Sequence, residues 1–189
     1  MARRGPPRRP PRMGGSVPAA SLVLVNTGDG KGKTTAAMGT VLRAVARGWA
    51  VSVIQFVKSG RWRSGEEEIA RRLGIEWWTG GDGFSWDSED LDRSAALARA
   101  AWAAAKEMIG SGDYELVVLD EITYPMNWGW IPVEEVARTI RERPAHVSIF
   151  ATGRDAPEPL RDVADTITEM RKARHAFDRG VRARRGIDF

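Results

Sequence analysis

The sequence predicts an α/β fold in which a mostly parallel β-sheet is flanked by helices within a single domain. Short apolar runs alternate with helical patterns along most of the chain, which is typical of this fold class. One run, residues 116–119, is apolar throughout and indicates a strand buried on both faces. The length of 189 residues allows one domain with a sizeable core, and no internal repeat suggests a second.

Each predicted element follows from a local pattern. Residues 33–47 place small and apolar side chains at helical spacing and end at Gly48, a typical residue after a helix. Residues 65–73 begin with glutamates and residues 132–142 with a proline, both suited to a first helical turn. The predicted strands are residues 22–26, 50–57, 75–79, 114–120, 146–152 and 165–170; the predicted helices are residues 33–47, 65–73, 89–109 and 132–142. Residues 157–162 join the last two strands, and residues 175–189 are basic and poorly periodic.

The composition excludes several classes of protein. Hydrophobic residues make up 42% of the chain and charged residues 29%, as in soluble globular domains. The sequence contains no run of about 18 apolar residues, so no membrane-spanning helix is predicted. Cysteine is absent, which excludes disulfides, thiolate metal sites and cysteine nucleophiles and fits a cytoplasmic location.

Positive charge is concentrated at the amino terminus. Residues 1–19 hold five arginines and no acid, so that subtracting them from the net charge of +4 leaves −1 for residues 20–189. This stretch is rich in proline and glycine and lacks the apolar segment of a secretory signal. We therefore expect a disordered basic tail over residues 1–19 and a folded domain over residues 20–189. The tail is expected to be a solvated extension, although contact with nucleic acid or a lipid surface is an alternative.

The segment that follows the first predicted strand has the layout of a P-loop. A glycine-rich turn leads into Lys33 and Thr34 at the start of a helix, so backbone N–H groups, a cation and the helix N-terminus would surround phosphates. The pattern predicts a P-loop NTPase-like (RecA-like) fold, with Lys33 on the phosphates and Thr34 on Mg²⁺. The usual spacing expects glycine where Thr27 stands. The candidate phosphate-binding residues are Gly28, Asp29, Gly30, Lys31, Gly32, Lys33, Thr34 and Thr35.

Three charged residues at strand ends are further candidates. Asp120 and Glu121 follow the buried strand, where P-loop proteins place a metal ligand or a base, although acids can also simply end a strand. Arg154 follows the strand over residues 146–152. Because ligands bind at the carboxyl ends of parallel strands, Arg154 is placed to reach a phosphate; a surface arginine is the alternative.

Aromatic residues in predicted loops form the other unusual feature. The chain has eight tryptophans and two tyrosines, and Trp62, Trp86, Trp128 and Trp130 lie in predicted loops. Phe84 and Trp86 adjoin a glycine-rich turn, where they would either bind an apolar ligand or fold back onto the core. These features alone leave kinases, ATPases and helicase-like motors open, because a fold does not fix a reaction.

Several motifs together resemble one family, the ATP:corrinoid (cob(I)alamin) adenosyltransferases of the cobalamin-synthesis type. The resemblance runs from Leu22 to Phe189, and it includes the terminal Gly-Ile-Asp-Phe. The motifs that carry it are residues 27–35 (TGDGKGKTT), 55–58 (QFVK), 83–86 (GFSW), 118–124 (VLDEITY), 152–154 (TGR) and 175–178 (HAFD).

The resemblance implies a reaction and roles for the candidate residues. A Co(I) corrinoid would attack C5′ of ATP and release triphosphate, with ATP bound along the loop in reversed polarity. The family carries threonine at the position of Thr27, whereas Asp29 departs from the asparagine expected. Charge on the triphosphate would be neutralised by Lys31, Lys33, Arg154 and Mg²⁺ (or Mn²⁺) held by Thr34 with Asp120 or Glu121. Catalytic roles are thereby implied for Lys33 and Glu121, and for Phe84 and Trp86 in displacing the lower cobalt ligand; Arg43 would lie near the adenosine.

The resemblance also implies partners. We expect the corrinoid and ATP as substrates, a flavodoxin-like reductase as electron donor, a homodimer and no nucleic acid. His146 and His175 are expected to be structural. The alternatives are a nucleic-acid-dependent P-loop ATPase with Glu121 polarising water, and a nucleotide-binding regulator without chemistry.

Overall fold

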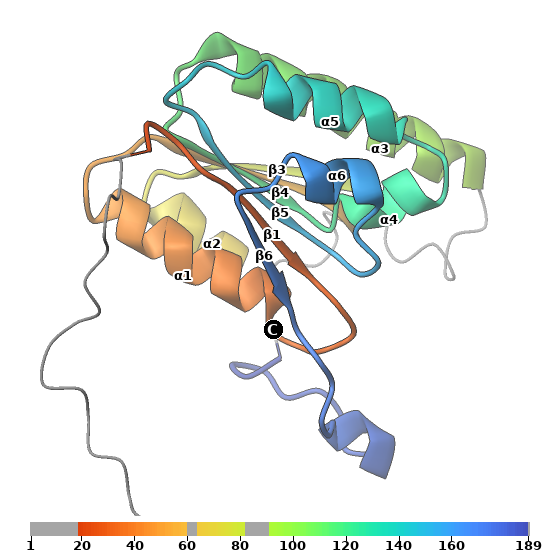
Figure 1. Cartoon of the computed structure of the whole chain (residues 1–189). Coiled ribbons are helices and arrows are strands. Elements are labelled where there is room, and N and C mark those ends of the chain that lie inside the picture. Colours follow the sequence, from red (N-terminus) through yellow and green to blue (C-terminus); the bar gives the residue numbers. More distant parts are fainter. Residues whose placement is uncertain (1–18, 60–63, 82–90, 189) are drawn as a thin grey trace, which may run out of the picture.

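A six-stranded parallel sheet forms the centre of the protein (Figure 1). The computed structural model describes residues 19–59, 64–81 and 91–188. Every neighbouring pair of strands in the order β3-β2-β4-β5-β1-β6 is parallel, which confirms the predicted fold class. The strands are β1 (Val23–Thr27), β2 (Val51–Ser59), β3 (Glu76–Gly81), β4 (Leu116–Asp120), β5 (Ser148–Thr152) and β6 (Thr166–Glu169).

Helices cover both faces of this sheet (Figure 1). The helices α1 (Lys33–Val45) and α2 (Gly65–Arg72) pack on one face. On the other face lie α3 (Leu91–Ser111), α4 (Thr123–Asn127), α5 (Val133–Arg141) and α6 (Glu158–Asp162). A short 3-10 helix, η2 (Ala176–Arg179), lies in the segment after β6.

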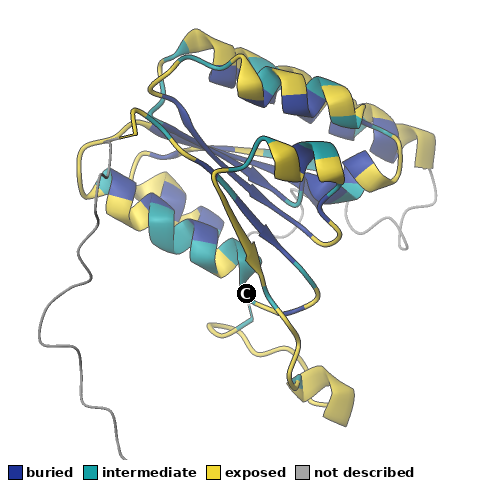
Figure 2. Ribbon diagram, in the orientation of Figure 1, coloured by how far each residue is buried: buried dark blue, intermediate teal, exposed yellow. Residues whose placement is uncertain are grey.

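Alternate residues of the central strands build two hydrophobic cores. Leu116 and Val118 of β4 face α1 and α2, whereas Val117 and Leu119 face the four helices on the opposite side. All four are at most 1% exposed, which confirms the prediction of a strand buried on both faces. Figure 2 shows the resulting buried sheet between two helical layers. Edge strand β6, in contrast, is exposed along its length.

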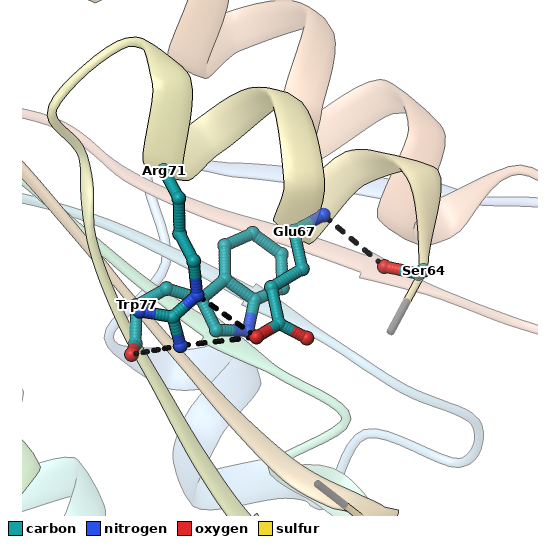
Figure 3. Close-up of polar contacts among 4 residues, drawn as sticks. All are labelled: Ser64, Glu67, Arg71 and Trp77. Atoms are coloured by element: carbon teal, nitrogen blue, oxygen red, sulfur yellow. Dashed lines mark hydrogen bonds and ion pairs between the residues drawn. The ribbon is translucent and has the colours of Figure 1, made fainter. Parts of the chain in front are cut away.

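Polar contacts fix α2 to the sheet (Figure 3). Ser64 Oγ accepts the Glu67 N–H at 3.2 Å and caps the helix. The Arg71 guanidinium binds the Glu67 carboxylate at 3.0 Å and donates to the carbonyl of Trp77 on β3 at 3.3 Å. The Glu67–Arg71 pair therefore ties α2 to the first half of β3.

Two helices depart from the sequence prediction. Thr123–Asn127 and Glu158–Asp162 form α4 and α6, although neither was expected to be helical. Both are only five residues long, and each is stabilised by burial of an apolar side chain, Met126 or Leu160, rather than by a periodic pattern. Trp128 follows α4 and stacks on Tyr124 with ring centroids 5.7 Å apart, so this loop tryptophan packs onto the protein's own helix.

The strand ends bring the predicted motifs to one edge. The loop after β1, the acids after β4 and the arginine after β5 all lie at the carboxyl edge of the sheet (Figure 1). The segment after β6 runs past this edge, and the carboxyl end of the chain lies beside the start of α1 (Figure 1). Within the described residues, no helix is long and apolar enough to cross a membrane.

The two tyrosines predict how stability responds to alkaline pH. A hydrogen bond to the Glu76 carboxylate raises the pKa of Tyr114 to about 12, and burial raises the pKa of Tyr124. Because the folded state holds these protons more tightly than the unfolded state, stability should fall as pH rises from about 10 towards about 12. At pH 10, tyrosinate absorbance should be weak in the folded protein and strong after unfolding in urea. Strong absorbance from folded Tyr114→Phe protein, which retains only Tyr124, would contradict the assignment.

Candidate functional site

The candidate site is a cavity of about 350 Å³ at the carboxyl edge of the sheet. Its wall combines the loop after β1 with residues that follow β4, β5 and β6 and with the first turn of α2. The lining residues are Asp29, Gly30, Lys31, Gly32, Lys33, Thr34, Thr35, Glu66, Glu121, Tyr124, Arg154, Lys172, His175, Phe177, Asp178 and Asp188. Sequence positions from both ends of the described part of the chain therefore meet in one hollow. Its lining includes four cationic side chains, from Lys31, Lys33, Arg154 and Lys172, and five carboxylates.

Lys33 lies across the phosphate loop. Its ammonium group donates to the carbonyls of Gly28 and Gly30 at 2.6 and 2.7 Å, so the side chain is held inside the turn. Burial, and then the nearby Arg154, lower the pKa of Lys33, whereas the acids Asp29, Glu121 and Asp120 oppose that shift. Among the residues that the structure describes, the two carbonyl partners of Lys33 leave one N–H of its ammonium group free to bind an anion such as phosphate.

Two glycines of the loop are required by the chain itself. The Gly30 N–H donates to the Met170 carbonyl at 2.6 Å, and a Cβ on Gly30 would lie 2.7 Å from that oxygen. Gly28 has φ 89°, and its Cβ would lie 2.6 Å from the same oxygen. The backbone that continues β6 thus passes directly against the loop, and only glycine leaves room for it.

Thr27, which stands where the usual P-loop has glycine, has a structural partner. Its side chain is buried at 2% exposure, and its hydroxyl oxygen accepts the Ala156 N–H at 3.0 Å. This bond joins the start of the phosphate loop to the turn that carries Arg154. A glycine at position 27 would leave the buried N–H of Ala156 without this acceptor.

A buried carboxylate connects the strand ends beneath the cavity. Asp120 is fully buried, and its Oδ1 accepts the hydroxyls of Thr34 at 2.9 Å and Thr152 at 2.7 Å. The Gln55 side-chain amide donates to Oδ2 at 2.9 Å. These three donors compensate the burial of a charge and fix the carboxylate's orientation. The arrangement joins α1, β2, β4 and β5 at one point.

Glu121 is turned toward the cavity by its backbone. Its φ of 64° is the left-handed conformation, which is uncommon for a non-glycine residue and occurs often at functional sites. The Glu121 N–H donates to the Thr152 hydroxyl at 2.9 Å, so the same threonine holds both acids. Asp120 lies beneath the cavity, whereas Glu121 belongs to its lining.

Arg154 is positioned from the neighbouring helix. The Thr123 hydroxyl donates to the Arg154 carbonyl at 2.6 Å, and the Asn127 amide donates to the Asp155 carbonyl at 3.0 Å. The backbone of this turn is therefore tied to α4, and the Arg154 side chain reaches the cavity.

The segment after β6 closes another side of the cavity. Lys31 pairs with Asp188 at 2.7 Å, and Lys172 pairs with Asp178 at 3.2 Å. His175, expected to be purely structural, also lies in the cavity wall, where its Nδ1 accepts the Phe177 N–H at 3.1 Å. His146, in contrast, lies far from it and binds the Gly112 carbonyl at 2.8 Å.

The structure brings most of the predicted residues together. Candidates from Asp29 to Thr35 line the cavity with Glu121 and Arg154. Gly28 and Asp120 do not line it but accept hydrogen bonds from the lining residues Lys33 and Thr34. Arg43 is exposed on α1, ten residues beyond Lys33 and hence roughly 15 Å along the helix. Phe84 and Trp86 lie outside the described residues. The sequence predicts no role for Gln55, Thr152, Lys172 or Asp188, although all of these except Lys172 lie in motifs that carry the resemblance. Gln55 and Thr152 also had a physical signal, since a polar residue in or at the end of a buried strand needs a partner.

A second, apolar cavity of about 360 Å³ adjoins the first between α1 and α2. It shares Thr35 and Glu66 with the phosphate cavity and is otherwise lined largely by apolar side chains such as Met38, Leu42 and Ile69.

Comparison with known proteins identifies similar chains. The family model described as ATP:corrinoid adenosyltransferase BtuR/CobO/CobP matches residues 19–189. A corrinoid adenosyltransferase of Escherichia coli (strain K12) is 41% identical over 168 residues, which cover 89% of this chain and 85% of that protein. Corrinoid adenosyltransferase CobA of Salmonella typhimurium (strain LT2) is also 41% identical, with the same coverage. A corrinoid adenosyltransferase of Pseudomonas aeruginosa is 39% identical and covers 89% of this chain and 83% of its own length.

The contact of Thr27 predicts that restoring the usual P-loop glycine is harmful. Thr27→Gly should lower the free energy of unfolding by about 1–3 kcal/mol, because the buried Ala156 N–H loses its acceptor and the chain gains freedom when unfolded. Urea unfolding measures the change. Thr27→Ser keeps the hydroxyl and should lose much less. A Thr27→Gly protein as stable as the original would show that the hydrogen bond contributes nothing.

Proposed function

This chain belongs to the ATP:corrinoid adenosyltransferase family, and we propose that the cavity lined by Lys31, Lys33 and Arg154 holds the triphosphate of ATP while a corrinoid attacks the nucleoside carbon. The protein is a transferase that moves the 5′-deoxyadenosyl group of ATP to the cobalt of a corrinoid. The observation that carries the residue assignments is the meeting of Lys31, Lys33 and Arg154 around one cavity above the Thr34–Asp120 hydrogen bond.

The chemistry requires no nucleophile from the protein. The Co(I) centre of the reduced corrinoid supplies the electron pair that forms the Co–C bond, and the C5′–O bond of ATP breaks. Its electron pair leaves with the triphosphate, and cobalt becomes formally Co(III). The protein therefore has to orient C5′ toward cobalt and stabilise negative charge on the leaving group.

The cavity's cations suit the second task. Lys33 is held in place by two carbonyls, so its ammonium group does not have to reorganise as charge develops. The backbone of Arg154 is tied to α4, and its side chain reaches the same cavity. Lys31 adds a third cation from the loop. The loop's backbone N–H groups and the N-terminus of α1 complete an anion-binding cradle.

The oxygen-bearing side chains fit a Mg²⁺ or Mn²⁺ ion bound with the triphosphate. Thr34, Asp120 and Glu121 offer hydroxyl and carboxylate oxygens, the donors these ions prefer. Both oxygens of Asp120 accept hydrogen bonds, whereas Glu121 lines the cavity. We therefore assign direct contact with the ion to Thr34 and Glu121, with Asp120 orienting the threonine. The bound ion would neutralise charge on the phosphate oxygens.

Other features remain predictions from the resemblance. These are the reversed polarity of ATP, the place of Arg43 near the adenosine, a homodimer and a flavodoxin-like reductase. A cytoplasmic location remains a prediction from the absence of cysteine. The boundary between a basic tail over residues 1–19 and the domain also remains a prediction. The comparisons offer no support for the alternative of an ATPase acting on nucleic acid.

The identity of the phosphate product tests the function. Incubation with ATP, Mg²⁺ and chemically reduced cobalamin should change the corrin spectrum to that of a Co–C product and release triphosphate rather than ADP. Lys33→Met should lower kcat by about 100-fold, since it removes a preorganised cation at the leaving group. Lys106→Met, which removes a cation on α3, is the matched control and should retain full activity. Release of ADP without a Co–C product would refute the proposal.

The aromatic pair predicts a dependence on the oxidation state of cobalt. We propose that Phe84 and Trp86 exclude the lower ligand, so that Co(II) is reduced more easily. Phe84→Ala and Trp86→Ala should therefore slow the reaction that starts from Co(II) with a reductase much more than the reaction that starts from preformed Co(I). Equal losses in both assays would mean that the rings serve only packing.

A further inference from the structure

We propose that the carboxyl-terminal segment, residues 170–188, belongs to the triphosphate site and that Asp188 competes with the triphosphate for Lys31. The inference rests on the proposed function, because it concerns the same phosphate cavity. It adds residues that lie far from the P-loop in sequence and gives them a role in binding and releasing the polyphosphate.

The segment is attached to the phosphate loop at both of its ends. At its start, the Met170 carbonyl accepts the Gly30 N–H at 2.6 Å and the Met170 N–H donates to the Thr27 carbonyl at 2.8 Å. At its other end, Asp188 pairs with Lys31 at 2.7 Å. The first attachment is backbone to backbone beside the buried sheet, whereas the second is a single ion pair between partly exposed side chains.

The geometry of Asp188 suits a carboxylate that stands beside a phosphate site. Its Oδ1 binds the Lys31 ammonium, and its Oδ2 accepts the Arg184 N–H at 2.8 Å, which fixes the carboxylate on a turn of the backbone. The hydrogen bond from Lys31 also lowers the pKa of Asp188, so the group stays ionised at neutral pH. A charged acid thus faces the cavity in which phosphate oxygens would lie.

A polyphosphate is the stronger partner for this lysine. An exposed ion pair between one ammonium and one carboxylate contributes little, because water screens it and both side chains lose freedom. A triphosphate carries several negative charges and is also bound by Lys33, Arg154 and the loop amides, so contact with Lys31 adds to a site that is already formed. The same exchange is open to Lys172, which pairs with Asp178 on the cavity wall at 3.2 Å.

The exchange has a consequence for turnover. Triphosphate is a multiply charged product held by several cations, and its release is favoured if a tethered carboxylate can take back one of them. The acid acts at a high effective concentration, because its segment stays anchored at Met170. Removing Asp188 should therefore make the product leave more slowly rather than weaken its binding.

Binding of inorganic tripolyphosphate, measured by titration calorimetry at constant ionic strength, tests the proposal. Asp188→Asn removes the charge with little change in shape and should tighten binding about two- to fivefold, the range expected for an exposed ion pair. Amide hydrogen exchange of residues 184–188 should become faster when tripolyphosphate binds to the original protein, because Asp188 then loses its ion pair with Lys31. Exchange of the Gly30 amide should not become faster.

A second background separates this competition from a general effect of charge. In Lys31→Met protein, the further change Asp188→Asn should leave the affinity for tripolyphosphate the same, because the lysine for which Asp188 and the phosphate compete is absent. Asp113→Asn, which removes an exposed acid at the opposite end of β4, is the matched control and should not change the affinity. Tightening by Asp188→Asn that persists without Lys31 would refute the competition, as would weaker binding or no change in Asp188→Asn itself.

The probe also separates this inference from the proposed function. If tripolyphosphate binds and Lys33→Met abolishes that binding, the phosphate cavity is confirmed, and only the Asp188 variants decide the inference. If tripolyphosphate binding does not depend on Lys33, the proposed phosphate site itself is wrong, and the inference falls with it.

Discussion

The hydrogen bonds to one buried carboxylate determine how the site is assembled. Asp120 lies out of contact with water and is stable there because Thr34, Thr152 and Gln55 donate to it. Each donor comes from a different element, so the charge can be satisfied only when α1, β2, β4 and β5 end in the correct relative positions. Leaving the buried Asp120 carboxylate without partners would be costly, and this cost favours the arrangement in which all three donors reach it. The same arrangement fixes the Glu121 backbone, because its N–H binds the Thr152 hydroxyl.

A second constraint explains the unusual phosphate loop. The chain that continues β6 lies against the loop so closely that a side chain at position 28 or 30 would collide with the Met170 carbonyl. Thr27 in turn supplies a hydroxyl to the turn that carries Arg154. The glycines thus serve contacts within the protein, in addition to the proposed close approach of a phosphate. The departure from the usual pattern at Thr27 has a packing reason, which is independent of how ATP is oriented.

These constraints suit a reaction in which the substrate brings its own nucleophile. The corrinoid supplies the electron pair, so the protein contributes position and charge. Glu121 and Arg154 follow strand ends and Lys33 begins α1, whereas the carboxyl-terminal segment contributes exposed ion pairs to the cavity wall. Such a site is consistent with binding a highly charged substrate and releasing triphosphate, which gains a further negative oxygen when the C5′–O bond breaks.

The sequence by itself determined the parallel α/β architecture, the glycine-rich loop after the first strand and the acids and arginine at the strand ends, because periodicity and motif spacing are local properties. Tertiary structure alone decided which distant residues complete the site. Gln55 and Thr152 are polar residues of buried strands, which indicates that each needs a partner, but only the packed sheet decides that this partner is Asp120. Asp188 meets Lys31 because β6 lies next to β1. The short helices α4 and α6 likewise form because the core buries one apolar side chain of each, a long-range contact that no local pattern contains.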